Sequence, residues 1–298
     1  MIHRGEGAAW KDLLVEIHTR PPVGRAMLIP AVAEPQLIWQ ISGRVLCEDR
    51  ELGGSWNAHS VEPNDLFLVT SPEPYELRWR AMAPEPMVVM HATLGLHCLA
   101  SAAREWSGEG SRIPRLKEFN GIQDPTILAF LEMLRKELTL QPRASGAFVH
   151  GIAQSLAAHL VRTYRDENDP RPHRSTALPA YPLHRVLSMM EGALQEGVSI
   201  GALATAVDLS ESHFSRMFKG STGFSPSRYF IRLRISKAQE LLRETKMPII
   251  EIGLEVGYTS PSHFAHVFRK ETGWSPHEYR ERMHSGRGME DFSRIAIE

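Results

Sequence analysis

Two kinds of hydrophobic periodicity divide the chain into a half that predicts strands and a half that predicts helices. In "YELRWRA", residues 75–81, apolar and charged side chains alternate, which is the period of a half-buried strand. Further short runs rich in β-formers are separated by Pro, Gly and Asn: "AMLIPAV", "QLIWQISGRVLCED", "DLFLVTSP" and "PMVVMHATL". An antiparallel sandwich or barrel is the expected closure for such strands.

Two amphipathic helices are predicted after these strands. Asp124 fits an N-cap with Pro125 at the first helical position. Apolar stripes follow at helical spacing on both helices: Ile127, Leu131, Leu134 and Leu138, then Val149, Ile152, Leu156 and Leu160 between about residues 144 and 164. These faces predict either a cap on the β core or a surface for self-association, and the pattern leaves both open.

A proline-rich stretch separates the two halves. Residues 165–182, "RDENDPRPHRSTALPAYP", contain four prolines and little to bury, which predicts an interdomain linker. The chain then divides into a domain of residues 1–164, this linker, a domain of residues 183–284 and a C-terminal tail of residues 285–298.

The second half repeats itself once. Residues 210–232 and 260–282 are identical at 11 of 23 aligned positions, where average composition gives roughly one or two by chance. Upstream the match continues at an offset of 49. This degree of self-similarity indicates a duplicated supersecondary unit.

Each copy reads as a helix, a short turn and a second helix. In the first, Ser199 and Ser210 are N-cap candidates on either side of a turn at "DLS"; in the second, Gly257 supplies the turn and Ser260 precedes Pro261. The copies therefore predict helix-turn-helix units at about residues 200–220 and 248–271.

The second helix of each unit, residues 210–219 and 260–270, has an apolar stripe and an opposite polar face. Phe214, Met217 and Phe218 form the first stripe, and Phe264, Val267 and Phe268 the second. The outward residues are Ser212, Arg216 and Lys219, then Ser262, His266 and Arg269, flanked by His213, Ser215, His263 and Ala265. Such a face suits the major groove of DNA, although for one unit alone an ordinary solvated surface helix is the favoured explanation, because helix-turn-helix look-alikes are common.

The segment between the units favours the DNA interpretation. Residues 225–245 contain no internal helix breaker, so they predict one helix of about 20 residues, roughly 30 Å long. Successive major-groove faces on one side of B-DNA lie about 34 Å apart. This helix is the right length to hold two reading helices one turn apart.

From about Leu183 to Met283, these motifs resemble the DNA-binding domain of the AraC/XylS family of transcription regulators. The resemblance implies seven helices, with base or phosphate contacts from Ser212, Ser215 and Arg216 in the first unit and Ser262, His263 and His266 in the second. It also implies phosphate contacts from Lys219, Arg269 and Lys270. Two residues depart from the family pattern: His266 stands where a basic or amide residue is common, and Gly253 replaces a usual alanine.

The first half is similar to the cupin-like sensor domains of that family. "EPNDLFLV" corresponds to a turn and strand that such domains write with Gly after Pro; here Asn64 stands instead, which tolerates the left-handed conformation. The resemblance implies a small-molecule pocket in a β-barrel, followed by helices that can dimerise. Aromatic residues of the predicted barrel are the candidate ligand contacts: Trp39, Trp56, Tyr75 and Trp79.

Enzymatic and metal chemistry have little support in the sequence. A metal-using cupin needs several converging histidines, yet "GGSWNAHSVEP" contains only His59 and Glu62. His91, His97 and Cys98 have neither metal-ligand spacing nor a second pair, so they predict structural roles. We therefore expect no metal, no cofactor and no catalytic residues.

Composition places few further constraints. Two cysteines, Cys47 and Cys98, and the absence of a long apolar run predict a cytoplasmic protein that does not enter a membrane. The net charge of −1 by itself gives no indication of a nucleic-acid partner.

The sequence thus predicts a two-domain α+β regulator with a cupin-like β-barrel, two helices and an all-helical DNA-binding domain. Its expected partners are double-stranded DNA, RNA polymerase, an unknown small-molecule effector and a second copy of the chain, and activation is the expected outcome. The alternative is a cupin-type small-molecule-binding or metal enzyme with an appended DNA-binding domain.

Overall fold

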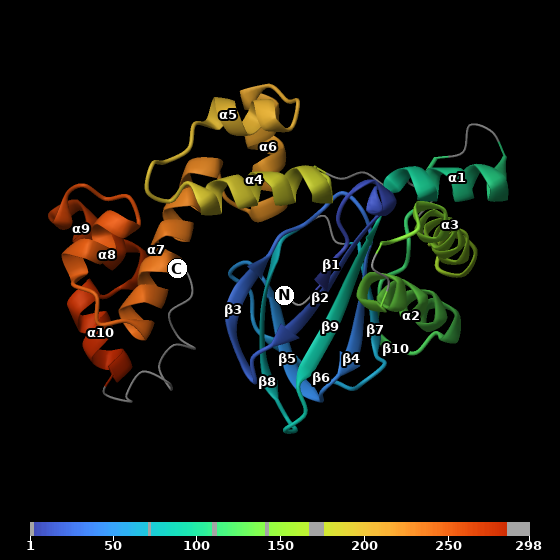
Figure 1. Ribbon diagram of the computed structural model, residues 1–298, viewed down its shortest axis with the longest axis horizontal. Coiled ribbons are helices and arrows are strands. Elements are labelled where there is room, and N and C mark those ends of the chain that lie inside the picture. Colours follow the sequence, from blue (N-terminus) through green and yellow to red (C-terminus); the bar gives the residue numbers. More distant parts are fainter. Residues whose placement is uncertain (1–2, 71–72, 109–111, 141–142, 167–175, 285–298) are drawn as a thin grey trace. The chain divides into compact units, whose positions relative to one another are not determined.

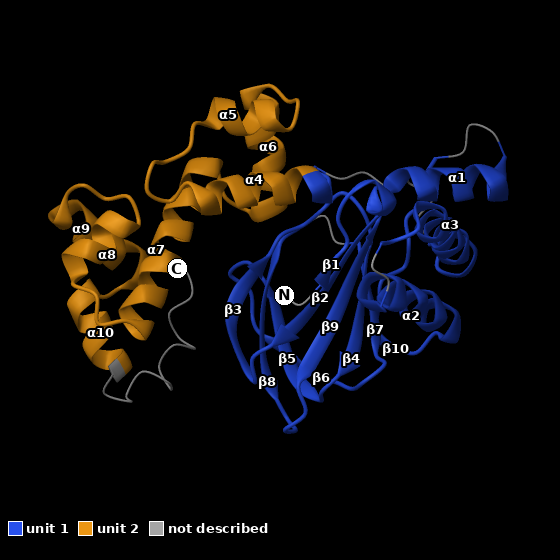
Figure 2. Cartoon of the chain, viewed as in Figure 1, with its two compact units in different colours: residues 1–181 blue, residues 182–298 orange. Residues whose placement is uncertain are grey.

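The computed structural model describes residues 3–70, 73–108, 112–140, 143–166 and 176–284. It consists of two compact units, residues 1–181 and 182–298 (Figure 2). The first unit contains the strands and the second is helical, which confirms the predicted α+β, two-part organisation.

The strands of the first unit form two antiparallel sheets (Figure 1). One has six strands in the order β1-β2-β9-β4-β7-β10, and the other has four in the order β3-β8-β5-β6. Their bounds are His3–Arg4 for β1, Leu13–Arg20 for β2, Val23–Ile29 for β3, Gln36–Ser42 for β4, Val45–Glu51 for β5, Asn57–Val61 for β6, Leu66–Val69 for β7, Tyr75–Ala81 for β8, Met87–Leu94 for β9 and Phe119–Ile122 for β10.

These sheets do not close into the predicted barrel. Among the described residues, no strand of one sheet pairs with a strand of the other. Side-chain packing joins them instead, since Phe67 of β7 and Met87 of β9 belong to a cluster with Cys47 of β5 and Trp79 of β8. The result is a double sheet, the arrangement that inward-facing apolar residues on two antiparallel sheets produce without a shared ladder.

Two sequence predictions for this unit are confirmed. The alternating segment 75–81 coincides with β8, and its Trp79 is buried. Asn64 adopts a φ of 73°, the left-handed conformation expected at this turn, and its N–H donates to the Gln40 carbonyl at 2.8 Å.

Three helices lie beside the six-stranded sheet (Figure 1): α1, Leu96–Ser107; α2, Pro125–Leu140; and α3, Gly146–Thr163. The two predicted helices are confirmed, with Asp124 Oδ1 accepting from the N–H groups of Thr126 and Ile127 at the start of α2. Ile127, Leu131 and Leu134 are fully buried in the main core, so this stripe caps the sheet and cannot serve self-association.

Helix α1 is absent from the sequence prediction. It starts directly after β9, and its buried stripe is built from small residues around Leu99: Cys98, Ala102 and Ala103. These residues recur at helical spacing, so the sequence carried a periodic signal for α1 that the prediction did not use.

Within its described residues, the second unit contains the seven helices that the resemblance implies (Figure 1). Their bounds are Ala180–Gly192 for α4, Ile200–Ala206 for α5, Glu211–Thr222 for α6, Pro226–Glu244 for α7, Ile249–Glu255 for α8, Pro261–Thr272 for α9 and Pro276–His284 for α10. The first two residues of α4 belong to the first unit.

The predicted linker, residues 165–182, differs from the structure at both ends. Asp166 donates its N–H to Arg115 O at 2.8 Å, and Ala33 donates to Leu178 O at 3.2 Å. Tyr181 Oη donates to Trp10 O at 2.6 Å. Both ends therefore pack onto the first unit through backbone pairing and burial of Ala177 and Leu178. Residues 167–175 and the tail of residues 285–298 lie outside the described residues.

Candidate nucleic-acid interface

The turns of the two predicted helix-turn-helix repeats have the same backbone geometry. Asp208 has a φ of 55°, and Leu209 N–H donates to Ala204 O at 3.0 Å. In the second copy Gly257 has a φ of 81°, and Tyr258 N–H donates to Gly253 O at 2.8 Å. A Cβ at Gly257 would lie 2.4 Å from Leu194 O, so close packing as well as φ requires glycine there.

The second helix of each helix-turn-helix repeat, α6 or α9, starts and ends in the same way. Ser210 and Ser260 accept from the N–H groups three residues later, at 3.4 and 3.3 Å. Both helices end at a left-handed glycine, Gly223 with a φ of 77° and Gly273 with a φ of 79°. The sequence repeat is therefore a structural repeat at its capping positions.

Burial follows the predicted stripe. Phe214 and Phe218 on α6 are buried, as are Phe264 and Phe268 on α9. The pattern of buried and exposed positions is identical along residues 211–219 and 261–269. Each repeat consequently presents the same helical face to solvent.

The predicted DNA contacts lie on these exposed faces. On α6, Ser212, Arg216 and Lys219 are exposed and Ser215 is half-buried. On α9 the corresponding exposed residues are Ser262, His263, His266, Arg269 and Lys270. Within the described part of the chain, Arg216 and Lys219 have no ion-pair partner, so their charges are available to a polyanion.

Helix α7 connects the two helix-turn-helix repeats. It has 19 residues, bounded by Ser225 and Thr245 as predicted, and spans roughly 28 Å at 1.5 Å per residue. Arg234 of α7 donates Nε to Leu194 O at 2.8 Å, in the segment between α4 and α5, and its guanidinium lies 5.6 Å from the ring centroid of Tyr258 in the second repeat. One side chain thus links the segment that precedes the first repeat to the second repeat.

The two departures from the family pattern have different structural settings. Gly253 is buried, and a Cβ there would lie 3.2 Å from Cδ1 of Phe264. The aromatic core of the second repeat therefore packs closely on this glycine. Ala204 occupies the equivalent position in the first repeat. His266 is exposed on α9, so packing inside the domain does not require a histidine at this position.

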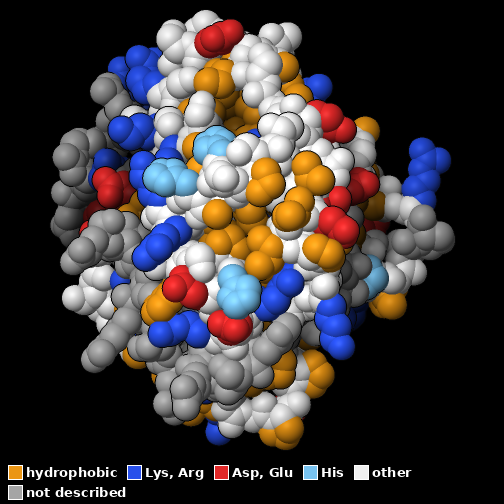
Figure 3. Space-filling view, turned by 90° about the vertical axis from the view of Figure 1, so that its left-hand side faces the viewer, with side chains coloured by type: hydrophobic (Ala, Val, Ile, Leu, Met, Phe, Trp, Pro, Cys, Tyr) orange, Lys and Arg blue, Asp and Glu red, His pale blue; other side chains and the backbone are white. Residues whose placement is uncertain are grey.

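Around these helices the surface is mixed in character. Seen from the side on which α8, α9 and α10 lie, it carries Lys, Arg and His side chains next to a group of hydrophobic side chains (Figure 3). On α8, Ile250 and Leu254 are 60% and 52% exposed.

In the first unit, the four aromatic ligand candidates are not brought to one place. Trp39 belongs to the core beneath the helices, whereas Trp79 lies between the sheets and donates Nε1 to Pro21 O at 2.9 Å. Trp56 is stacked against Arg50 and Arg78, at 4.4 and 4.2 Å from the ring centroid. Burial and the nearby Asp49 and Cys47 raise the pKa of Tyr75.

A surface groove of about 660 Å³ lies elsewhere on this unit. Its lining comes from the segment around β1 and the short helix Ala8–Trp10, and from the end of α2 and start of α3. Arg4, Trp10, Glu137 and Arg143 contribute charged and aromatic groups. Sequence reasoning missed this groove because most of the sequence of this unit lies between its two walls.

The residues considered for metal chemistry have varied partners. His59 Nδ1 lies 3.3 Å from Asp49 Oδ1, while Glu62 pairs with Arg44 at 2.7 Å, so the two do not converge. Burial lowers the pKa of His91 to about 3, and the charges of His18 and Arg20 act in the same direction. His97 and Cys98, in contrast, lie beside Asp12, a residue that sequence spacing gave no reason to place there.

Comparison with known proteins bears on the helical unit above all. Residues 203–282, which contain both repeats, match the family described as "Helix-turn-helix domain". GbdR, a transcriptional regulator of Pseudomonas aeruginosa, is 36% identical over 78 residues, 26% of this chain and 21% of the relative. ArgR, a regulator from the same organism, is 25% identical over 232 residues, 70% of each chain.

A solved AraC-type regulator structure from Chromobacterium violaceum is 33% identical and covers 35% of this chain and 92% of its own, with a TM-score of 0.33. The chain belongs to the AraC/XylS family of transcription regulators. The family resemblance predicted from the two repeats is thereby confirmed, although the chain spans only about a fifth of the length of GbdR. No helix in the described part of this family member is long and apolar enough to cross a membrane.

Proposed function

We propose that this protein is a sequence-specific transcription regulator that binds double-stranded DNA through α6 and α9. The observation that carries the proposal is the duplication of one exposed polar face, residues 211–219 and 261–269, on helices with identical caps and buried stripes. A single solvated helix would need no copy, whereas DNA presents the same groove again after one turn.

Electrostatics and connection support the same conclusion. Arg216 and Lys219 on α6, and Arg269 and Lys270 on α9, are exposed at matching ends of the two helices. Arg can pair with guanine O6 and N7, and Lys can neutralise phosphates. The continuous helix α7 gives the two faces a fixed separation.

A selection from randomised duplex DNA tests this proposal. The full-length protein should enrich a motif with two recognisable half-sites about one helical turn apart, and its affinity should fall as salt rises. Equal recovery of all sequences, or binding that is insensitive to salt, would contradict it.

The first unit is proposed to sense a small molecule, without being an enzyme. Its double sheet and its groove of about 660 Å³ are large enough for a drug-sized ligand. His59 and Glu62 support no metal enzyme of cupin type, because each is paired with a different residue. Thermal shift with a library of amino acids, amines and aromatic acids would identify the ligand class.

Homodimerisation and contact with RNA polymerase complete the proposal. Met133, Leu140 and Phe148 are 44%, 69% and 43% exposed on α2 and α3, outside the buried stripe. Sedimentation velocity tests the dimer, and transcription in vitro with purified polymerase tests activation. A monomer at all concentrations would rule out the dimer, and a fall in transcript would identify a repressor.

A further inference from the structure

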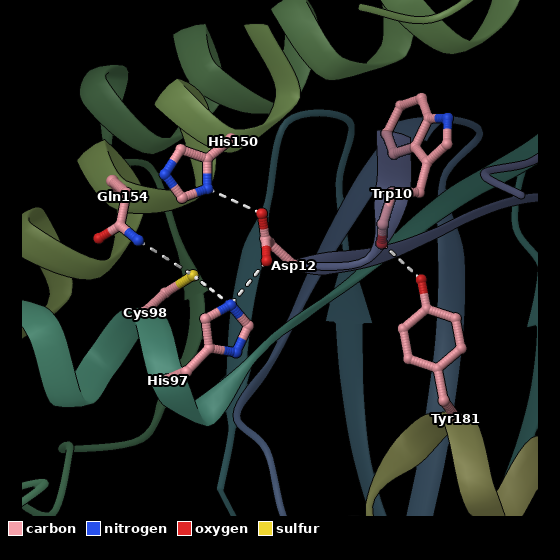
Figure 4. Close-up of polar contacts among 7 residues, drawn as sticks. All are labelled: Trp10, Asp12, His97, Cys98, His150, Gln154 and Tyr181. Atoms are coloured by element: carbon pink, nitrogen blue, oxygen red, sulfur yellow. Dashed lines mark hydrogen bonds and ion pairs between the residues drawn. The ribbon is translucent and has the colours of Figure 1, made fainter. Parts of the chain in front are cut away.

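Four potential metal ligands meet on the first unit although they are far apart in the sequence. Asp12 follows the short helix Ala8–Trp10, His97 and Cys98 lie in the first turn of α1, and His150 lies on α3 (Figure 4). Asp12 Oδ1 is 2.7 Å from His97 Nε2, and Asp12 Oδ2 is 2.8 Å from His150 Nδ1. Cys98 Sγ is 3.4 Å from His97 Nε2.

The burial of these groups is graded. Asp12 and Cys98 are buried, while the side chains of His97 and His150 are 56% and 51% exposed. An ion can therefore approach past the two imidazoles and meet the carboxylate and the sulfur beneath them. An accessible path of this kind is one of the requirements for a metal site.

We propose that Asp12, His97, Cys98 and His150 form a binding site for a transition-metal ion with the preferences of Zn²⁺. One thiolate, two imidazoles and one carboxylate make a four-ligand set of the kind that holds zinc in proteins. The ligand atoms of Asp12, His97 and Cys98 all lie within 4.8 Å of one another. Tetrahedral coordination at about 2.0–2.3 Å separates ligand atoms by roughly 3.3–3.7 Å.

The rearrangement needed to bind an ion is small for Asp12, His97 and Cys98. His150 is not part of the group of ligand atoms within 4.8 Å of one another, so it would have to move closer. The Cys98–His97 separation of 3.4 Å already has this size, and the two Asp12–His contacts would open by less than about 1 Å. The same nitrogens that now share a proton with Asp12 would then face the ion. Cys98 would bind as the thiolate, and its Sγ–H proton would be released to solvent.

Gln154 adds a positioning contact. Its Nε2 lies 3.6 Å from Cys98 Sγ, one helical turn along α3 from His150. An amide N–H directed at a metal-bound sulfur fixes the sulfur and stabilises its negative charge.

The same unit contains such a structural pair for comparison. Asp124 Oδ2 is 2.8 Å from both His159 Nε2 and Tyr164 Oη, and no cysteine among the described residues joins that group. Cys47 provides the second comparison, because it is buried and lies outside the Asp12 cluster. His159 and Cys47 are therefore matched controls for His150 and Cys98.

Cobalt and zinc titrations test the site on full-length protein prepared without a histidine tag and stripped with a chelator. Co²⁺ should bind at one equivalent with a thiolate-to-cobalt charge-transfer band, and Zn²⁺ should displace it. Cys98→Ser should abolish the band, and His150→Gln should weaken Zn²⁺ binding at least about tenfold. Gln154→Ala should weaken it about 10- to 100-fold, whereas His159→Gln and Cys47→Ser should leave band and affinity unchanged.

Alkylation of the wild-type protein keeps the test decisive if a variant does not fold. One equivalent of Zn²⁺ should slow modification of Cys98 at least about tenfold, with no effect on Cys47. Failure of Co²⁺ to produce a thiolate band in the wild type, or equal zinc affinity in wild type and His150→Gln, would overturn the proposal. Loss of DNA binding would not overturn the proposal, because all four ligands lie in the first unit.

Discussion

Arg228 of α7 forms an ion pair with Glu271 of α9, with 2.5 Å between Nη1 and Oε1. The Glu271 side chain is only 5% exposed, whereas the Arg228 side chain is 41% exposed. This contact fixes the end of the second reading helix to the helix that connects the repeats, so it contributes to the spacing of the two faces.

Glu271→Gln should therefore destabilise the protein by about 1–3 kcal/mol, since it removes a charge-assisted hydrogen bond from a buried acceptor. Glu240→Gln is the matched control, because Glu240 pairs with Lys237 on the same helix but both are about 40% exposed. That exposed pair should contribute less than about 0.5 kcal/mol. Urea unfolding followed by circular dichroism measures both, and equal effects would show that the Arg228–Glu271 pair adds no more than a surface pair.

The two reading helices should contribute unequally to sequence preference. Arg216→Ala should relax preference at one or two base pairs, because a bidentate contact to guanine is worth about 1–3 kcal/mol of discrimination. Arg269→Ala should weaken all sequences about equally and lower the salt slope by roughly one. Selection from randomised DNA by each variant gives both quantities. A larger loss of preference in His266→Ala than in Arg216→Ala would reverse the assignment.

Leu131 and Met133 are two positions apart on α2 but differ in burial. Leu131→Glu should unfold the first unit, because it places a carboxylate in the core and leaves a cavity, at a cost of more than about 3 kcal/mol. Met133 is 44% exposed, so Met133→Glu should change stability by less than about 0.5 kcal/mol. Thermal melts separate the two variants. Sedimentation of Met133→Glu then reports self-association without interference from unfolding.

Asp124 should make stability depend on pH in the acid range. Burial by itself raises the pKa of Asp124, but hydrogen bonds from His159, Ile127 N–H and Tyr164, with the His159 charge, outweigh it and lower the pKa below its usual value. Stability from a depressed carboxyl pKa is present above the unfolded value, 3.8, and is lost as pH falls through the folded value.

Asp124→Asn keeps a capping residue on α2 and removes the charge. The variant should be less stable than wild type by about 1–3 kcal/mol at neutral pH. This difference should shrink as pH falls below about 4. Urea titrations at several pH values measure it, and a difference that grows in acid would contradict a lowered Asp124 pKa.

Local patterns were enough to predict the two helix-turn-helix repeats and the helix that connects them. Caps such as Ser210 and Ser260, turns at Asp208 and Gly257, and the paired Phe stripes all act within a few residues, so the amino-acid sequence determines them directly. The outward face of each helix follows once its stripe is known. The exposed positions of Ser212, Arg216 and His266 were predictable for this reason.

Long-range packing decided what the sequence left open. Whether Leu131 faced the core or a second copy depended on the sheet that α2 covers, and whether the strands closed into a barrel depended on edges that no local pattern describes. Asp12 meets His97 and His150 only because α1 and α3 pack together beside the segment that precedes β2. The Asp12–His97 contact joins residues that are 85 positions apart in the sequence, and the Asp12–His150 contact joins residues that are 138 positions apart. Tertiary packing sets such contacts, because periodicity describes neighbours within one element and not which elements meet.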